Sequence, residues 1–299
     1  MLMRFKLLSL FACVSMPAMA SLNVFVCQPD WADLVHAHAP QAQVFSATTA
    51  LQDPHYVQAR PSLIARMRNA DLVVCSGAEL EIGWLPELQR QSRNRQVQNG
   101  QPGLFWVSDY VRLLDEHDHV DRSMGDVHAH GNPHVQFAIG DMIAVSRALS
   151  DRLALLAPDD APKFKANGAR FRWQWHKKMQ EWQARAVPLH GMEVAGYHST
   201  FAYLFDWLSM EQVAGLEPKP GIPPTAGHLN RLAQQDWSSL SGIVYASHQP
   251  KDAAYWLASR TNVPVVELAQ SVGGQPNTSS LVALVDDSIE RLLSLVKEQ

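Results

Sequence analysis

The sequence predicts an α/β fold of two similar lobes, each a parallel sheet flanked by helices, joined by one long backbone helix. Short apolar runs of strand length alternate with helix-length segments in both halves of the chain. This alternation is typical of βα units around a parallel sheet. One long helical pattern separates the two alternating halves. The length of 299 residues corresponds to about two domains.

The composition excludes several classes of protein. The chain is 46% hydrophobic and 18% charged, which excludes intrinsic disorder because disordered chains are poorer in apolar residues. The net charge of −4 argues against nucleic acid as the main partner, since phosphate binding requires a basic surface. The unusual feature is the presence of 13 histidines in a nearly neutral chain.

The first twenty residues are predicted to be a signal peptide. Two basic residues precede the apolar run 7–14, which is too short to span a bilayer. Ala18 and Ala20 form the small-x-small pattern that a signal peptidase accepts, so we expect cleavage after Ala20. A buried N-terminal helix and a lipoprotein signal around Cys13 are the alternatives. No later segment has the apolar run of a transmembrane helix, so the mature chain is expected to be soluble and exported.

The first lobe is expected to cover residues 21–158. The expected strands are residues 22–27, 43–46 and 71–75, followed later by the apolar run 104–107. The expected helices are residues 29–36, 61–70, 79–90 and 133–156. Residues 115–131 lack apolar periodicity and are predicted to form a polar, histidine-rich loop.

Residues 159–187 are expected to be the linking helix. Asp160 is placed to cap it, and Pro162 lies near the first turn. Large side chains recur on one helical face at Phe171, Trp175, Met179 and Trp182. We interpret this stripe as core packing rather than as a cofactor site.

The second lobe is expected to cover residues 188–299. Its expected strands are residues 192–196, 212–216, 242–246 and 263–268. Its expected helices are residues 201–208, 226–235, 251–261 and 281–296. The two halves share this rhythm but no detectable sequence repeat.

Two cysteines follow the predicted signal peptide, Cys27 and Cys75, and each closes a strand-like apolar run. If these strands are neighbours in a parallel sheet, the two cysteines lie close together. Export permits a disulfide between them. Two small buried thiols are the alternative.

Three histidines occur in similar settings. His55 and His134 each follow a proline in Asp53-Pro54-His55 and Asn132-Pro133-His134, and His198 comes just after a predicted strand. The carboxyl edge of an open α/β sheet is where ligands bind, and neutral imidazole is a good ligand for Zn²⁺ and similar metals. These residues therefore predict a metal site in the cleft between the two halves.

Several short motifs, taken in order, resemble the zinc- and manganese-binding solute-binding proteins of metal ABC transporters, of cluster A and the zinc-uptake type. The resemblance covers nearly all of residues 22–299. The motifs are Asp53-Pro54-His55, Pro61-Ser62, the segment 70–74, Gly77-x-Glu79-x-x-x-x-Trp84-Leu85, Asn132-Pro133-His134, His198-x-x-Phe201-x-Tyr203 and the proline-rich segment 215–224 before a helix.

The resemblance implies two α/β lobes joined by a rigid helix, with metal ligands at His55, His134 and His198. It also implies a periplasmic, monomeric protein that is not an enzyme. Such a protein captures a divalent transition metal and delivers it to a membrane ABC permease.

In one position the chain departs from the family pattern. The family usually supplies a carboxylate from the last strand-to-loop segment, where this chain has Gln270. The fourth metal ligand is therefore left open among water, Gln270, Glu267 and His248. Three imidazoles suit Zn²⁺, whereas Mn²⁺ prefers carboxylate oxygens, so we expect Zn²⁺ rather than Mn²⁺.

The remaining histidines fall into two groups. Residues 115–131 contain His117, His119, His128 and His130 among acidic residues. The resemblance implies a tract that gathers zinc near the main site, and a solvated polar loop is the alternative. The others are interpreted as structural or exposed: His36, His38, His176, His190 and His228.

Two alternative functions have chemical grounds. Three histidines with an open position also describe a catalytic zinc site. However, the sequence lacks H-E-x-x-H, and Asp53 is the nearest candidate for a general base. Binding of a metal chelate, a haem or a corrinoid in the cleft is the other alternative.

Overall fold

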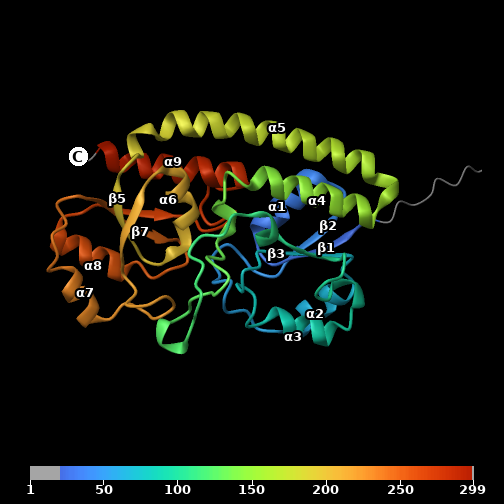
Figure 1. Cartoon of the computed structure of the whole chain (residues 1–299), viewed down its shortest axis with the longest axis horizontal. Coiled ribbons are helices and arrows are strands. Elements are labelled where there is room, and N and C mark those ends of the chain that lie inside the picture. Colours follow the sequence, from blue (N-terminus) through green and yellow to red (C-terminus); the bar gives the residue numbers. More distant parts are fainter. Residues whose placement is uncertain (1–20, 298–299) are drawn as a thin grey trace, which may run out of the picture.

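The computed structural model describes residues 21–297. The predicted signal peptide and its cleavage site after Ala20 lie outside the described residues. Within residues 21–297 the chain forms two four-stranded sheets, with strand orders β2-β1-β3-β4 and β6-β5-β7-β8. Every strand pair is parallel. The predicted α/β class with two similar halves is confirmed (Figure 1).

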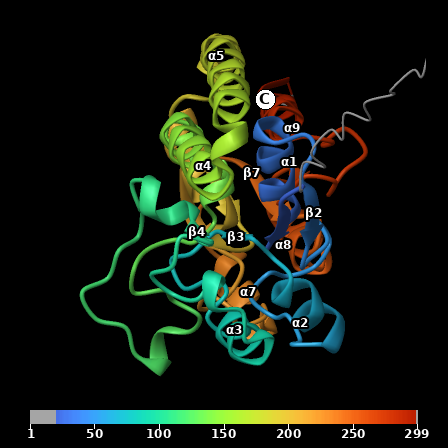
Figure 2. The same ribbon diagram turned by 90° about the vertical axis from the view of Figure 1, so that its right-hand side faces the viewer.

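The first half contains one sheet with helices on both of its faces (Figure 2). Its strands are β1 (Asn23–Val26), β2 (Gln43–Ser46), β3 (Leu72–Cys75) and β4 (Leu104–Trp106). Its helices are α1 (Pro29–His38), α2 (Pro61–Arg68), α3 (Leu85–Ser92) and α4 (Met142–Leu156).

The second half repeats the same strand order. Its strands are β5 (Glu193–Gly196), β6 (Glu211–Gly215), β7 (Leu240–Ala246) and β8 (Val265–Leu268). Its helices are α6 (Ala202–Leu208), α7 (Ala226–Leu232), α8 (Asp252–Thr261) and α9 (Leu281–Lys297).

The long helix α5 (Ala161–Ala186) runs across both halves (Figure 1). The predicted aromatic stripe is buried, because Trp175 and Trp182 are fully enclosed and Phe171 is 8% exposed. The Trp175 indole donates to the carbonyl of Ile139 at 3.0 Å, and the Trp182 indole donates to Asp286 of α9 at 2.8 Å. The stripe thus attaches α5 to both halves.

Two predicted helices begin later than their sequence pattern indicates. Residues 79–84 form turns, and α3 begins at Leu85, because Ala78 and Glu79 have φ angles of 47° and 68°. The buried carboxylate of Glu81 holds this turn by accepting hydrogen bonds from the backbone N–H groups of Ser76 and Gly77.

The second late start is in the predicted helix 133–156. The chain first makes a single 3-10 turn at Val135–Phe137, and α4 begins at Met142. The side chain of Asn132 accepts the backbone N–H of His134 at 3.0 Å. This bond fixes a turn where the periodicity alone predicts helix.

The two cysteines that follow the signal peptide form a disulfide. Cys27 follows β1 and Cys75 ends β3, and their Cα atoms are 4.9 Å apart. The two strands are neighbours in the first sheet. Of the two possibilities, a disulfide or two buried thiols, the structure shows the disulfide. Among residues 21–297, no helix combines the length and the apolarity needed to span a membrane.

Candidate metal centre

The structure brings His55, His134 and His198 together. One ring nitrogen of each lies within 4.8 Å of one nitrogen of the other two. The ring centroids are separated by 5.5 Å for His55–His134, 5.3 Å for His134–His198 and 6.1 Å for His55–His198. His55 lies in the loop after β2, His134 precedes α4, and His198 follows β5. The cluster therefore draws on both halves of the fold.

Each of the three rings donates its Nδ1–H to an oxygen. The acceptors are Asp53 Oδ1 for His55 at 2.8 Å, Asn132 Oδ1 for His134 at 2.9 Å and Glu217 Oε2 for His198 at 2.8 Å. Such acceptors fix the tautomer and the orientation of a metal-binding histidine. The Nε2 atoms are thereby left free for coordination.

The Asp-Pro-His and Asn-Pro-His motifs use the same local device. Asp53 Oδ1 also accepts the backbone N–H of His55 at 2.9 Å, and Asn132 Oδ1 accepts that of His134 at 3.0 Å. An Asp or Asn side chain readily bonds the backbone two residues ahead. One short motif therefore sets both the turn and the imidazole orientation.

Burial keeps His134 uncharged. His134 is 3% exposed, and burial, followed by the neighbouring His198, holds the pKa of His134 well below its usual value. A neutral imidazole is the form that binds metal. Among the described residues, no group hydrogen-bonds the buried Nε2 of His55. A buried polar atom without a partner calls for an ion or a water molecule.

A cavity of about 330 Å³ opens beside the three histidines. Gln270 and His248 both line it, whereas the Glu267 carboxylate accepts from Tyr245 Oη at 2.8 Å and from Gln275 Nε2 at 2.5 Å. Two of the three side chains considered for the fourth position therefore face the cavity, and Glu267 is bonded elsewhere. Burial lowers the pKa of His248 to about 4.

The sequence places His128 only in the histidine-rich tract, and the structure brings it beside His55. Its ring stacks on His55 with centroids 5.4 Å apart, and His55, Asp126 and His128 form a second group of possible ligands. The segment is placed by two tertiary bonds: Ala129 N–H donates to Glu79 at 2.9 Å, and Asp126 N–H donates to the carbonyl of Pro220 at 2.7 Å. No local pattern in the sequence indicates either bond.

The other histidines lie away from the cluster. In the loop, His117, His119 and His130 are exposed. His38 is buried on α1 and bonds the carbonyl of Leu34 and the hydroxyl of Ser146, both at 2.8 Å. His228 bonds the carbonyl of Gly215 at 2.9 Å. Three more are exposed on the surface: His36, His176 and His190.

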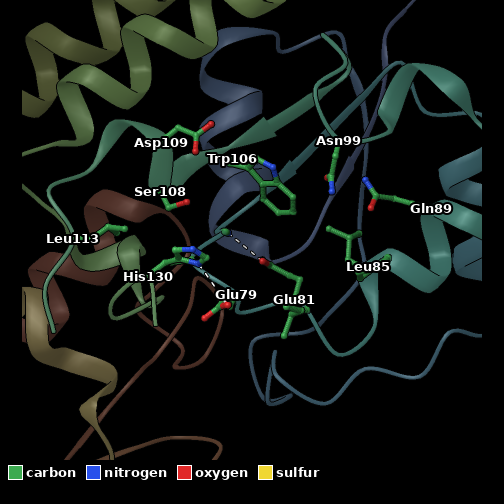
Figure 3. A pocket seen from close by; sticks show the side chains of 14 residues that line it. Glu79, Glu81, Leu85, Gln89, Asn99, Trp106, Ser108, Asp109, Leu113 and His130 are labelled. Carbon is green, nitrogen blue, oxygen red and sulfur yellow. Dashed lines mark hydrogen bonds and ion pairs between the residues drawn. The ribbon is translucent and has the colours of Figure 1, made fainter. Parts of the chain in front are cut away.

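A larger cavity of about 520 Å³ lies in the first half and is lined in part by Glu79 (Figure 3). Its lining includes Glu81, Trp106 and His130. Burial raises the pKa of Glu81 to about 7, but this carboxylate already accepts two backbone N–H groups. The side chains that could bind a metal, the three clustered histidines, therefore line the smaller cavity of about 330 Å³.

Two of the carboxylates beside the histidines, Asp53 and Glu217, orient the rings rather than act as hydrolytic bases. Asp53 and Glu217 each accept a hydrogen bond from a ring Nδ1–H, so the accepting oxygen already has a partner. The geometry is that of ligand orientation rather than of water activation.

Comparison with known proteins identifies one family of periplasmic metal-binding proteins. The profile of the family described as "ZnuA: Zinc-uptake complex component A periplasmic" matches residues 24–294. The high-affinity zinc uptake system protein ZnuA of Yersinia pestis is 27% identical over 223 residues, which are 70% of this chain and 70% of that protein.

Solved structures share the fold. A crystal structure of ZnuA has a TM-score of 0.75 and 19% identity, and the match covers 91% of this chain and 99% of that one. Cd-bound and Mn-bound structures of a periplasmic metal-binding protein from Candidatus Liberibacter asiaticus have TM-scores of 0.74 and 16% identity, covering 93% of this chain and 100% of theirs. Since the family profile spans almost all described residues, the chain belongs to the ZnuA family of periplasmic metal-binding proteins, the non-enzymatic solute-binding components of metal ABC transporters.

Proposed function

We propose that this protein captures Zn²⁺ in the periplasm through His55, His134 and His198 and delivers it to an ABC permease. The observation that carries the proposal is the convergence of three imidazoles from both halves, each oriented through Nδ1. Imidazole nitrogens suit Zn²⁺, whereas Mn²⁺ favours oxygen ligands. Of the nearby carboxylates, those of Asp53 and Glu217 are engaged with the rings, while Asp126 also lines the cavity.

The proposed mechanism places the ion between two lobes. We assign residues 21–158 and 188–299 to the lobes and residues 159–187 to the link, in a monomeric protein exported by cleavage after Ala20. His55 and His134 come from the first lobe and His198 from the second, so small shifts of one lobe against the other change the coordination. Release to the permease then requires only a small displacement.

The test is metal binding by the mature protein after removal of metal with a chelator. We expect one tightly bound Zn²⁺ per chain, measured by competition with a chromophoric chelator. His55→Ala, His134→Ala and His198→Ala should each weaken binding by more than about 100-fold, since loss of an outer partner alone costs about 10–100-fold. His176→Ala, an exposed substitution on α5, is the matched control.

Two results contradict the proposal. Wild-type protein that takes up no Zn²⁺ would exclude the capture role. Tighter binding of Mn²⁺ than of Zn²⁺ in direct competition would exclude the assignment of the metal while leaving the metal site in place.

A further inference from the structure

We propose that His248 is the fourth ligand of the ion and binds it through Nδ1, so that each half of the fold contributes two imidazoles. This inference rests on the proposed capture of Zn²⁺ at His55, His134 and His198. It assigns the open coordination position to a side chain of the second half.

The sheet topology brings His248 to the same edge as His198. β5 and β7 are hydrogen-bonded neighbours, with Gly196 paired to Val244. His198 follows β5 by two residues, and His248 follows β7 by two residues. Neighbouring strands lie about 4.8 Å apart, so both side chains leave the sheet at the carboxyl ends of adjacent strands.

The first half has an interacting pair at the corresponding strand ends. β1 and β3 hold the places in the first sheet that β5 and β7 hold in the second. At their carboxyl ends, Cys27 and Cys75 are joined by a disulfide. The carboxyl edge of the two equivalent strands thus carries a disulfide in the first half and, slightly further along the chain, two histidines in the second.

The ring of His248 lies in the cavity with one nitrogen that lacks a hydrogen-bond partner among the described residues. His248 lines the cavity that also contains His55, His134 and His198. Its Nδ1 atom is buried and finds no hydrogen-bond partner within residues 21–297. Leaving such an atom unpaired is unfavourable, and a metal ion in the cavity would supply the missing partner.

The other candidates fit the open position less well. Gln270 offers only an amide, a weak ligand, and its Nε2 donates to the carbonyl of Gln52 at 3.1 Å. The Nε2 of His128 is likewise buried without a hydrogen-bond partner among the described residues, and His128 is grouped with His55 and Asp126. However, neither of the two cavities that His128 lines contains all three clustered histidines. His248 shares its cavity with all three clustered histidines.

Coordination by His248 requires a small movement. Its nitrogen lies outside the set of three whose ligand atoms are within 4.8 Å of one another. The turn that carries it is held by Gln249, whose Oε1 accepts the backbone N–H of Ala246 at 2.8 Å. Rotation of the His248 side chain, or a slight approach of the second sheet, then completes a four-nitrogen site of the kind that Zn²⁺ accepts.

The experiment compares His248→Ala and His248→Gln with wild type and with His176→Ala. Zn²⁺ affinity is measured by chelator competition, and Co²⁺ is used as a spectroscopic probe because its absorption reports ligand number and geometry. We expect both substitutions at His248 to weaken Zn²⁺ binding by at least about 10-fold. Both should also change the Co²⁺ spectrum, whereas His176→Ala should change neither.

The outcomes separate this inference from the proposed function. If His134→Ala abolishes tight binding but His248→Ala keeps the wild-type affinity and Co²⁺ spectrum, the fourth ligand is not His248 and the capture role stands. If His128→Ala produces the loss instead, the ligand comes from the loop. If wild type binds no Zn²⁺, the proposed function itself fails.

Discussion

At the scale of single residues, the side chains that accept the Nδ1–H groups of the three histidines differ in their sequence separation from the histidine. Asp53 and Asn132 are two residues from their histidines, so the motif that supplies the imidazole also orients it. Glu217 is 19 residues from His198 and bonds it across β6. Glu217 Oε2 also accepts the backbone N–H of Gly221 at 3.0 Å, so this carboxylate couples the ring to the turn beside the loop.

Replacing Glu217 therefore tests orientation without removing a ligand. Glu217→Gln keeps the size of the side chain but removes the charge that stabilises the Nδ1–H of His198. We expect Zn²⁺ affinity to fall by about 10–100-fold, with little change in the free energy of unfolding. Chelator competition and urea denaturation measure the two effects. Glu211→Gln, an exposed change on β6, is the control, and an equal loss of affinity there would contradict the assignment.

The sequence predicts that His55, His134 and His198 lie together, for a physical reason. His55, His134 and His198 follow strands or open helices, and a parallel sheet collects such positions at one edge. His128 reaches His55 only through bonds to Glu79 and Pro220 that join distant segments. Tertiary contacts of this kind leave no periodicity to detect.

At the scale of elements, the histidine-rich loop bridges the two halves. Its end at Ala129 is bonded to Glu79 of the first half, and Asp126 is bonded to Pro220 of the second. The other loop histidines, His117, His119 and His130, are exposed. The loop thus lies beside the three clustered histidines without supplying any of them.

We expect the loop histidines to bind additional metal weakly rather than to form the tight site. Changing all four to asparagine preserves polarity and removes the imidazoles: His117, His119, His128 and His130. One tight Zn²⁺ should remain, while the weaker binding seen at higher metal concentration should disappear. Isothermal titration calorimetry counts both classes. Loss of the tight site in this variant would show that the loop supplies a ligand.

Helix α1 contacts the second half through a buried carboxylate. Asp30 is 1% exposed, and it accepts the Ser271 hydroxyl at 2.6 Å and the Val272 backbone N–H at 3.0 Å. Burial raises the pKa of Asp30 from 3.8 to about 6. The folded protein therefore holds this proton more tightly than the unfolded chain does.

The raised pKa sets the direction of a pH effect on stability. The contribution of Asp30 is fully present below the unfolded pKa of 3.8 and is lost as pH rises through about 6. Ionisation then costs the folded state about 3 kcal/mol. Asp30→Asn removes this titration, so its stability relative to wild type should rise between pH 4.5 and pH 7.5. Urea unfolding of the metal-free protein measures it.

Asp151→Asn is the matched control for that measurement. Asp151 is exposed on α4, so its variant should follow the wild-type pH profile. Parallel profiles for wild type and Asp30→Asn would contradict the raised pKa.

Neither the burial of Asp30 nor its partners in the second half can be predicted from the sequence, because the pattern of α1 shows only an acidic residue in the first turn.

At the scale of the whole molecule, α5 and a shared core restrict motion between the halves. One cluster of buried apolar side chains continues from Val24 in the first sheet through Trp175 to Leu284 in α9. The sequence predicts the length of α5 and its aromatic face from periodicity. It does not predict the contact with α9, where Arg185 pairs with Asp286 at 2.8 Å, because that pairing joins segments 101 residues apart.

Because α5 packs against both halves through this shared core, we expect metal capture to leave the overall shape nearly unchanged. A helix of 26 residues, about 39 Å long and buried against both halves, cannot bend without opening the core around Trp175 and Trp182. Small-angle X-ray scattering should therefore give the same radius of gyration for metal-free and Zn²⁺-loaded protein, within the error of the measurement. His134→Ala, to which Zn²⁺ is added without tight binding, controls for the effect of the ion on the solution. A decrease in the radius of gyration in wild type alone would show a hinge closure that α5 does not prevent, and release to a permease would then require reopening of the halves rather than a local shift.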